Sequence, residues 1–150
     1  MANKKIKNAS SLVAEGITFR SKLEYNIFKI LKEAKIRNLE YEKYKFVIWE
    51  GYKPTLPFFI KNKKTGLLQN DTKKIMSITY TPDFTFTYKE YFSIVEVKAF
   101  ENDVFPYKKK LFRRFLEEKH KEDKNFLPVY CQIGSKREML EFLQILQTLK

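Results

Sequence analysis

Histidine and cysteine are scarce in this 150-residue chain, which has one of each, His120 and Cys131. One cysteine cannot form an intrachain disulfide, and one cysteine with one histidine cannot supply the ligands of a conventional zinc site. His120 lies among charged residues, which predicts a place at the surface. Cys131 lies in an apolar run, which predicts a place in the core. A Cys–His hydrolase would need the two residues to meet, and no feature of the sequence indicates that they do.

Long apolar runs are absent as well, because the longest, Phe46 to Trp49, has four residues. A membrane-spanning helix needs about 20. The first residues, Met-Ala-Asn-Lys-Lys-Ile-Lys, are basic but lead into no apolar stretch, unlike a secretory signal. We therefore predict a cytoplasmic protein with no membrane partner.

Acidic residues are outnumbered, with 18 Asp and Glu against 30 Lys and Arg, which gives a formal net charge of +12. This excess favours polyanions such as nucleic acids, because each cation that neutralises a phosphate releases a condensed counterion. A soluble, lysine-rich protein without such a partner has the same composition. Charge alone therefore leaves nucleic-acid binding open.

The length and composition indicate one globular domain. Domains commonly have about 100–200 residues, and a hydrophobic content of 43% is too high for a disordered chain. No repeat, linker or low-complexity tract divides the sequence. Residues 1–15 are polar and include Lys4, Lys5 and Lys7, so we expect a flexible basic N-terminal arm before a single domain over 16–150.

The spacing of apolar residues predicts three helices separated by several strands. Ser21 with Glu24, and Ser135 with Glu138, form capping-box patterns that begin two of the helices. Turns are expected at Asn62–Gly66 and at Lys89-Glu90. The expected helices cover 21–34, 106–119 and 135–149, and the expected strands cover 41–49, 58–60, 75–80, 83–88, 92–97 and 127–133. Together they indicate an α/β (α+β) fold with a mixed sheet flanked by helices.

One constellation carries chemical information. The run Thr81-Pro82-Asp83-Phe84 is followed, thirteen residues after Asp83, by Glu96-Val97-Lys98. Asp83 and Glu96 lie at similar distances on either side of the Lys89-Glu90 turn, so they should face each other across a hairpin. Glu96 and Lys98 are two residues apart on one strand and therefore share a face, whereas Val97 points the other way.

Two carboxylates beside a lysine suit a hard cation and a hydrolytic reaction. Mg²⁺ prefers carboxylate oxygens, keeps several waters and accepts substrate phosphate as a further ligand. Lys98 could orient or deprotonate an attacking water, or stabilise charge in the transition state. The alternative is a solvated hairpin salt bridge.

Glu24 has two readings. Its neighbours on the helix, Ile27, Phe28 and Leu31, are apolar, which places the carboxylate at the inward edge of the helix. It could be a third acidic group that supports the metal, or it could only close the capping box with Ser21.

These residues carry a family resemblance. The patterns Gly16-x-x-Phe19-x-Ser21-x-x-Glu24, Tyr80-Thr81-Pro82-Asp83-Phe84 and Val95-Glu96-Val97-Lys98 resemble those of the PD-(D/E)xK nuclease superfamily. In order and spacing they are similar to phage endonuclease I-type Holliday junction resolvases and related uncharacterised phage nucleases. The resemblance covers about residues 16–133.

The resemblance implies a restriction-endonuclease-like αβββαβ core and a Mg²⁺-dependent DNA endonuclease, with Mn²⁺ able to substitute. Asp83 and Glu96 would be metal ligands together with the backbone carbonyl of Val97, Lys98 the catalytic lysine, and Glu24 a catalytic carboxylate that reaches the metal through water. It also implies phosphodiester hydrolysis that leaves 5′-phosphates, branched DNA as substrate, a homodimer, no small-molecule cofactor and, for a phage-encoded protein, the cytoplasm of a bacterial host.

Two other functions stay open. One is a nuclease of the same fold that cuts ordinary duplex, as restriction or transposition enzymes do, and the other is a non-catalytic DNA-binding protein. The chain departs from related phage sequences by having Ala99-Phe100 where a glycine often follows the lysine, and by a long basic segment between Trp49 and Ile75. These departures bear on specificity.

Several further cations are candidates for phosphate binding. Lys108 shares the apolar side of its helix and could point towards the metal site, whereas Lys109 and Arg113 lie on the opposite side, where a solvated helix face is an equal reading. Lys61, Lys63 and Lys64 occupy the first expected hairpin, which could grip a duplex or be a solvated loop. Trp49, Tyr44 and Phe46 are expected in the core.

Overall fold

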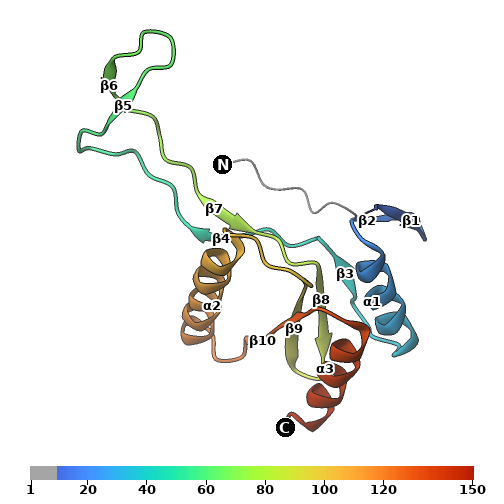
Figure 1. Ribbon diagram of the computed structural model, residues 1–150. Coiled ribbons are helices and arrows are strands. Elements are labelled where there is room, and N and C mark those ends of the chain that lie inside the picture. Colours follow the sequence, from blue (N-terminus) through green and yellow to red (C-terminus); the bar gives the residue numbers. More distant parts are fainter. Residues whose placement is uncertain (1–9) are drawn as a thin grey trace.

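The computed structural model describes residues 10–150, and this part of the chain forms a mixed α/β fold of three helices and ten short strands (Figure 1). The helices are α1 (Lys22–Glu33), α2 (Phe105–Glu122) and α3 (Lys136–Thr148). The strands are β1 (Leu12–Ala14), β2 (Ile17–Phe19), β3 (Glu40–Tyr41), β4 (Phe46–Trp49), β5 (Phe59–Lys61), β6 (Leu68–Asn70), β7 (Ile78–Tyr80), β8 (Phe84–Tyr88), β9 (Tyr91–Val97) and β10 (Leu127–Ile133).

Four of the strands form the central sheet, in the order β10-β9-β8-β3. Strands β8 and β9 are an antiparallel hairpin whose turn is the expected Lys89-Glu90, with Lys89 at a φ of 54°. Strand β10 runs parallel to β9, and such a pair needs a crossover connection, which here is α2. The predicted mixed sheet is therefore confirmed.

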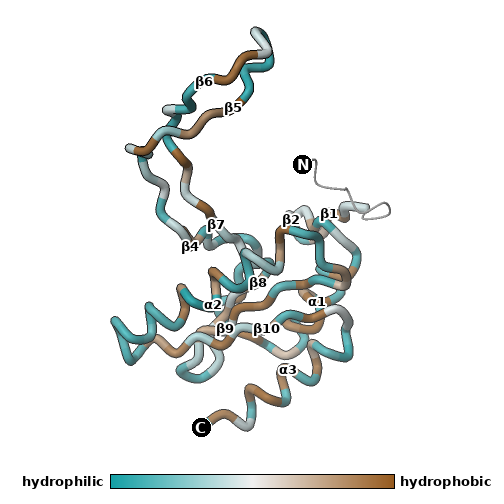
Figure 2. Tube along the Cα trace, turned by 60° about the vertical axis from the view of Figure 1, so that its left-hand side comes forward, coloured by the Kyte–Doolittle hydropathy of each residue, from teal (hydrophilic) through white to brown (hydrophobic). Residues whose placement is uncertain are grey.

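Helices cover both faces of this sheet, because its strands alternate apolar side chains between two cores. Val95 of β9 joins the core under α1 and α3, whereas its neighbour Ile94 joins the core under α2. Phe19, Phe84 and Met139 are fully buried in the first core. In Figure 2 the sheet strands are accordingly mostly hydrophobic where they cross the body of the molecule.

The two predicted capping boxes begin their helices. The hydroxyl of Ser21 accepts the Glu24 backbone N–H of α1 at 3.1 Å, and that of Ser135 accepts the Glu138 N–H of α3 at 3.2 Å. Each hydroxyl satisfies one of the backbone donors that a helix start leaves without an intrahelical partner.

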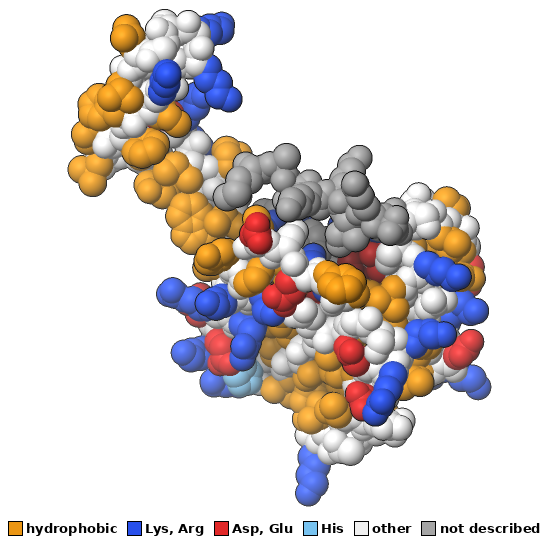
Figure 3. Space-filling model, in the orientation of Figure 1, with side chains coloured by type: hydrophobic (Ala, Val, Ile, Leu, Met, Phe, Trp, Pro, Cys, Tyr) orange, Lys and Arg blue, Asp and Glu red, His pale blue; other side chains and the backbone are white. Residues whose placement is uncertain are grey.

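The segment between β4 and β7, residues 50–77, leaves the body as a long two-stranded excursion, which we call the arm (Figure 1). Its base is tight, since a Cβ on Gly51 would lie 2.4 Å from the Ile75 carbonyl oxygen. Its tip is the β5–β6 hairpin, closed by the predicted turn, where Gly66 N–H donates to the Asn62 carbonyl at 2.8 Å. Figure 3 shows hydrophobic side chains along the arm and lysines around its tip.

The predicted strand over 41–49 is wrong in one respect, because the chain breaks it. Glu42 has a φ of 47°, a left-handed conformation that ends β3 after Tyr41. Its N–H donates to the Asp83 carbonyl at 2.8 Å, so the turn is fixed against the start of β8. β3 therefore pairs with β8, whereas β4 pairs with β7 at the base of the arm. The strand expected over 75–80 is likewise shorter, and only its last three residues form β7.

Part of the expected N-terminal arm is also structured. Leu12–Ala14 is a strand that pairs with Ile17–Phe19, and Glu15 and Gly16 turn the chain at positive φ values of 52° and 74°. Residues 1–9 lie outside the described part of the chain. Over residues 10–150, no helix has the length and apolar character that crossing a membrane requires.

Candidate active site at the end of the central hairpin

Asp83 and Glu96 meet where β8 begins and β9 ends. Phe84 pairs with Val95, and the next step of the same register sets Asp83 opposite Glu96. Both residues are buried, with exposures of 6% and 7%. The Asp83 carboxylate also accepts the Val97 N–H at 2.7 Å, which fixes it against the last residue of β9. The predicted pairing of the two carboxylates is therefore supported by the register.

Two tyrosines hold Glu96 from behind. The Tyr80 hydroxyl donates to a Glu96 carboxylate oxygen at 2.7 Å, and the hydroxyls of Tyr80 and Tyr130 lie 2.9 Å apart. The ring of Phe112 packs on Tyr80, with ring centres 4.4 Å apart. The orientation of Glu96 is thus set by β7, β10 and α2 together, and neither tyrosine was predicted as a site residue from the sequence.

Burial and mutual repulsion govern the charge of this pair. Burial raises the pKa of Asp83 to about 8, and the neighbouring Glu96 carboxylate adds to the increase, opposed by the Val97 N–H. Burial also raises the pKa of Glu96, against the Tyr80 hydrogen bond and the charge of Lys98. Two carboxylates held at one point in a low-dielectric site disfavour ionisation, and a cation between them would remove that cost.

Lys98 extends the same face of the β9 strand beyond its end. Its ammonium lies 3.8 Å from a Glu96 carboxylate oxygen and 4.5 Å from the centre of the Phe105 ring. The backbone N–H of Lys98 donates to the Ile133 carbonyl at 2.7 Å, which fixes this residue against β10. The Lys98 side chain is 22% exposed, which leaves the amine within reach of a substrate.

Glu24 closes the capping box, and it also contacts β3. One of its carboxylate oxygens accepts the Ser21 hydroxyl at 3.1 Å, and the other accepts the Arg20 N–H at 3.0 Å and the Tyr41 hydroxyl at 2.6 Å. The charge of Glu24 still contributes to the raised pKa values of Asp83 and Glu96. Glu24 therefore closes the capping box, as expected, and its support of a metal ion stays a prediction.

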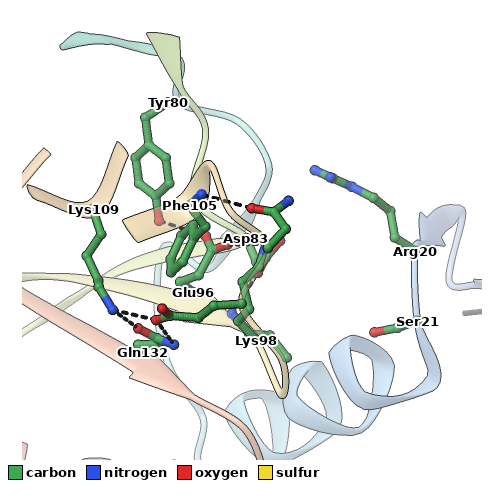
Figure 4. Close-up of polar contacts among 12 residues, drawn as sticks. Arg20, Ser21, Tyr80, Asp83, Glu96, Lys98, Phe105, Lys109 and Gln132 are labelled. Atoms are coloured by element: carbon green, nitrogen blue, oxygen red, sulfur yellow. Dashed lines mark hydrogen bonds and ion pairs between the residues drawn. The ribbon is translucent and has the colours of Figure 1, made fainter. Parts of the chain in front are cut away.

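A polar cleft of about 300 Å³ opens in front of Glu96. It is lined by Glu96, Lys98 and Arg20, which Figure 4 labels, and by a further cation, Lys108 of α2. Lys108 thus lines the cleft, as its place on the apolar side of the helix led us to expect. Arg20 was missed because it directly precedes the helix cap, where no sequence pattern marks a cleft residue. Its guanidinium is 64% exposed and pairs with Glu42.

The other predicted phosphate-binding residues do not line this cleft. Lys109 pairs with Glu101 at 2.5 Å and donates to Gln132 at 3.0 Å, so it is not a solvated cation. Arg113 lines a separate depression, with His120 and Tyr130 among its neighbours. Lys61, Lys63 and Lys64 lie at the tip of the arm, away from the body (Figure 1).

The donor set suits a cation that needs few protein ligands. Over residues 10–150, no group of three Asp, Glu, His or Cys side chains is placed to hold a metal ion. Mg²⁺ commonly binds through one or two carboxylates, with waters and phosphate as its other ligands. Asp83, Glu96 and the Val97 carbonyl meet that requirement, whereas a zinc site would need more side chains.

The lone cysteine and histidine take no part in the cleft. Cys131 is half-buried in β10, and burial raises the pKa of its thiol to about 11, so the nucleophilic thiolate is disfavoured at neutral pH. The Nδ1 atom of His120 lies 2.8 Å from the Phe126 carbonyl oxygen at the end of α2, and the residue is partly buried there.

Comparison with protein-family models, with curated proteins and with solved structures finds no match to this chain.

Proposed function

We propose that this protein is a metal-dependent DNA endonuclease that hydrolyses phosphodiester bonds. One observation carries the proposal: two buried carboxylates, Asp83 and Glu96, lie opposite each other behind a cleft whose rim holds Lys98, Lys108 and Arg20. A bound cation would stabilise the paired carboxylates, and a bound anion would stabilise the cluster of cations. A phosphodiester bound together with a divalent metal ion would provide both: the metal ion for the carboxylates and the phosphate for the cations.

The architecture supports the same proposal. When the arm, the β4–β7 pair at its base, the N-terminal hairpin and α3 are set aside, the remaining elements follow in the order α1, β3, β8, β9, α2 and β10, which is the αβββαβ order of a restriction-endonuclease-like core. The four strands in that order are the four strands of the central sheet. We include this core assignment in the proposal.

The side chains have separable tasks in the proposed reaction. Asp83, Glu96 and the Val97 carbonyl would hold Mg²⁺ or Mn²⁺, and Tyr80 keeps Glu96 in its orientation. The bound metal ion would neutralise charge at phosphorus and lower the pKa of a coordinated water. Lys98 orients the attacking water and stabilises the charge that develops on the phosphate.

Hydrolysis joins the water oxygen to phosphorus and breaks the bond to the 3′-oxygen, which takes a proton. The products are a 5′-phosphate and a 3′-hydroxyl. Arg20 and Lys108 line the same cleft as Lys98, where they can hold the flanking phosphates in line. We propose branched DNA as the substrate on the basis of the family resemblance.

The test compares an immobile four-way junction with a linear duplex of the same sequence, in Mg²⁺ and in EDTA, with Glu96→Gln as the control. Metal-dependent cuts at symmetric positions in the junction alone would support a junction-resolving enzyme. Equal cutting of both DNAs would support a nuclease acting on ordinary duplex. Binding by a folded protein without any cutting would overturn the enzyme and favour a DNA-binding protein on this scaffold.

A further inference from the structure

The arm carries apolar side chains that are exposed in the described part of the chain. Near its tip they include Phe58, Phe59, Ile60, Leu67 and Leu68, which are 62%, 60%, 46%, 70% and 73% exposed. Single exposed apolar residues are common on protein surfaces, whereas a contiguous apolar patch marks an interaction site. A two-stranded hairpin is also marginally stable by itself, so this one needs a partner surface.

Both faces of the hairpin are apolar. Phe59 pairs with Asn70 and Lys61 with Leu68, and directly paired residues share a face, so Phe59 and Leu68 lie on one side. Ile60 pairs with Gln69 and lies on the opposite side, where strand alternation also places Leu67. A ribbon of this kind suits a groove with two walls better than it suits a flat surface.

Such a groove lies at the base of the arm. Its walls are Val47 and Trp49 of β4 on one side, and Leu111 and Phe115 of α2 on the other, around a volume of about 400 Å³. Val47 and Trp49 are 39% and 37% exposed. The sequence analysis expected Trp49 in the core, and the structure instead places it in the wall of an open groove. We call this feature the base groove.

The charges of the two surfaces are complementary. Glu50, Glu118 and Glu122 line the base groove with Arg114 and Lys119. Glu118 pairs with Arg114 and Glu122 pairs with Lys119, so Glu50, at the root of the arm, supplies the excess negative charge of the groove. The arm contains six lysines against two acidic residues. Three of the lysines, Lys61, Lys63 and Lys64, are at its tip, and within the described residues they form no ion pair.

The geometry points to a second copy of this chain as the partner. We propose that the protein dimerises by inserting the tip of each arm into the base groove of the other copy. The base groove adjoins the root of the arm, and the hairpin is at the far end of the arm (Figure 1). Two antiparallel arms would therefore place each tip beside the partner's groove. One two-fold axis then generates two identical contacts, as an isologous dimer requires.

The area involved is sufficient for a stable dimer. Aromatic side chains can each bury about 150–250 Å², so the five distal side chains at their present exposure offer on the order of 500 Å² per arm. Two such contacts, with the groove walls that they cover, approach the roughly 1,600 Å² of a standard stable interface. An arm contacting DNA would leave these apolar residues in water.

The test measures the oligomeric state of the full-length protein by sedimentation, in EDTA and without DNA. We expect a dimer for the wild type, and at least a tenfold weaker dimer for Leu67→Ser/Leu68→Ser in the arm and for Val47→Lys in the groove. Leu140→Ser/Ile145→Ser is the matched control, because both residues are exposed on α3, far from the arm in sequence, and it should dimerise normally.

Mixing the two defective variants makes the test specific. The arm variant has an intact groove and the groove variant has an intact arm. The mixture should therefore form heterodimers, although each variant alone dimerises weakly. A monomeric wild type, or a dimer insensitive to both variants, would overturn the proposal. No recovery in the mixture would indicate arm-to-arm pairing, and an arm defect seen only in DNA affinity would assign the arm to nucleic acid; both results would overturn it.

Failure of the proposed nuclease activity would leave these measurements unchanged. Asp83→Asn, which removes a proposed metal ligand, should dimerise as the wild type does. The dimer and the chemistry of the cleft can therefore fail separately.

Discussion

Asp83 and Glu96 are the residues at which this protein gives up stability. Each is more than nine-tenths buried, and among residues 10–150 the ion pair nearest to them is that of Lys98, at 3.8 Å from Glu96. An uncompensated buried carboxylate opposes folding. In our proposal, the fold gives up this stability for the capacity to bind a cation, which is a common cost of functional sites.

The first prediction concerns pH. The unfolded Asp83 carboxyl loses its proton near pH 4, whereas the folded one keeps it to about pH 8, so the folded state binds more protons between these values. Stability without metal should therefore fall as pH rises through that window. Asp83→Asn removes this term, and its free energy of unfolding in EDTA should exceed that of the wild type by more at pH 8 than at pH 5. Urea unfolding at both pH values measures the difference, which a pH-independent result would contradict.

The second prediction separates metal binding from catalysis. Mg²⁺ should raise the thermal midpoint of the wild type at pH 8, because a ligand that binds only the folded state stabilises it. Asp83→Asn and Glu96→Gln should lose this gain. Lys98→Ala should keep it and lose cleavage, since the amine is placed for the substrate and the attacking water. A Lys98→Ala protein that cleaves normally would remove Lys98 from the catalytic set.

At the scale of elements, the two capped helices offer a matched comparison. Ser21 and Ser135 make the same hydrogen bond to the third residue of their helices, at 3.1 and 3.2 Å. Replacing either by alanine should lower stability by about 1 kcal/mol. Only Ser21 adjoins Arg20, which lines the cleft, and Glu24, whose charge acts on Asp83.

The third prediction follows from that difference. Ser21→Ala should reduce the cleavage rate several-fold, whereas Ser135→Ala should leave it within about twofold of the wild type at equal cost in stability. Chemical denaturation and single-turnover cleavage of the same preparations provide both quantities. Equal rates in the two variants would mean that the start of α1 does not position Arg20 for the reaction.

The helices and the central hairpin were predictable because their signals are local. The capping boxes, the Lys89-Glu90 turn and the alternation of β9 each depend on residues that are only a few positions apart in the sequence. The break at Glu42 was not predictable, because its left-handed backbone is fixed by a hydrogen bond to Asp83, which is distant in sequence. Tertiary contact decided that boundary.

The same distinction applies to the site. Asp83, Glu96 and Lys98 lie on one hairpin, so sequence spacing was enough to place them together. Arg20 and Tyr130 reach the cleft and its supporting network from opposite ends of the chain, and only the packing of β10 and α1 around the hairpin brings them there. Lys108 could be named as a candidate because helical spacing places it on the same side as Leu111, Phe112 and Phe115.

At the scale of the whole molecule, the described residues of one chain supply every side chain that we assign to the proposed site. Glu96, Lys98, Lys108 and Arg20 come from the same copy, and the arm that we assign to the dimer contact leaves from the opposite end of β7. Dimerisation would therefore supply a second cleft and would not complete the first. A monomer should retain the chemistry and lose only the coordination of two cuts.

The fourth prediction uses a supercoiled plasmid that extrudes a cruciform. Two incisions by a dimer in one binding event convert it directly to linear product, whereas independent incisions accumulate nicked circles first. The wild type should yield linear product without a nicked lag. Leu67→Ser/Leu68→Ser should nick the plasmid at a rate per cleft within about twofold of the wild type, because transition-state stabilisation depends on groups within the cleft and these two leucines lie outside it. In this variant, linear product should form much later than nicked circles. Loss of nicking itself in this variant would mean that the arm of one copy completes the active site of the other.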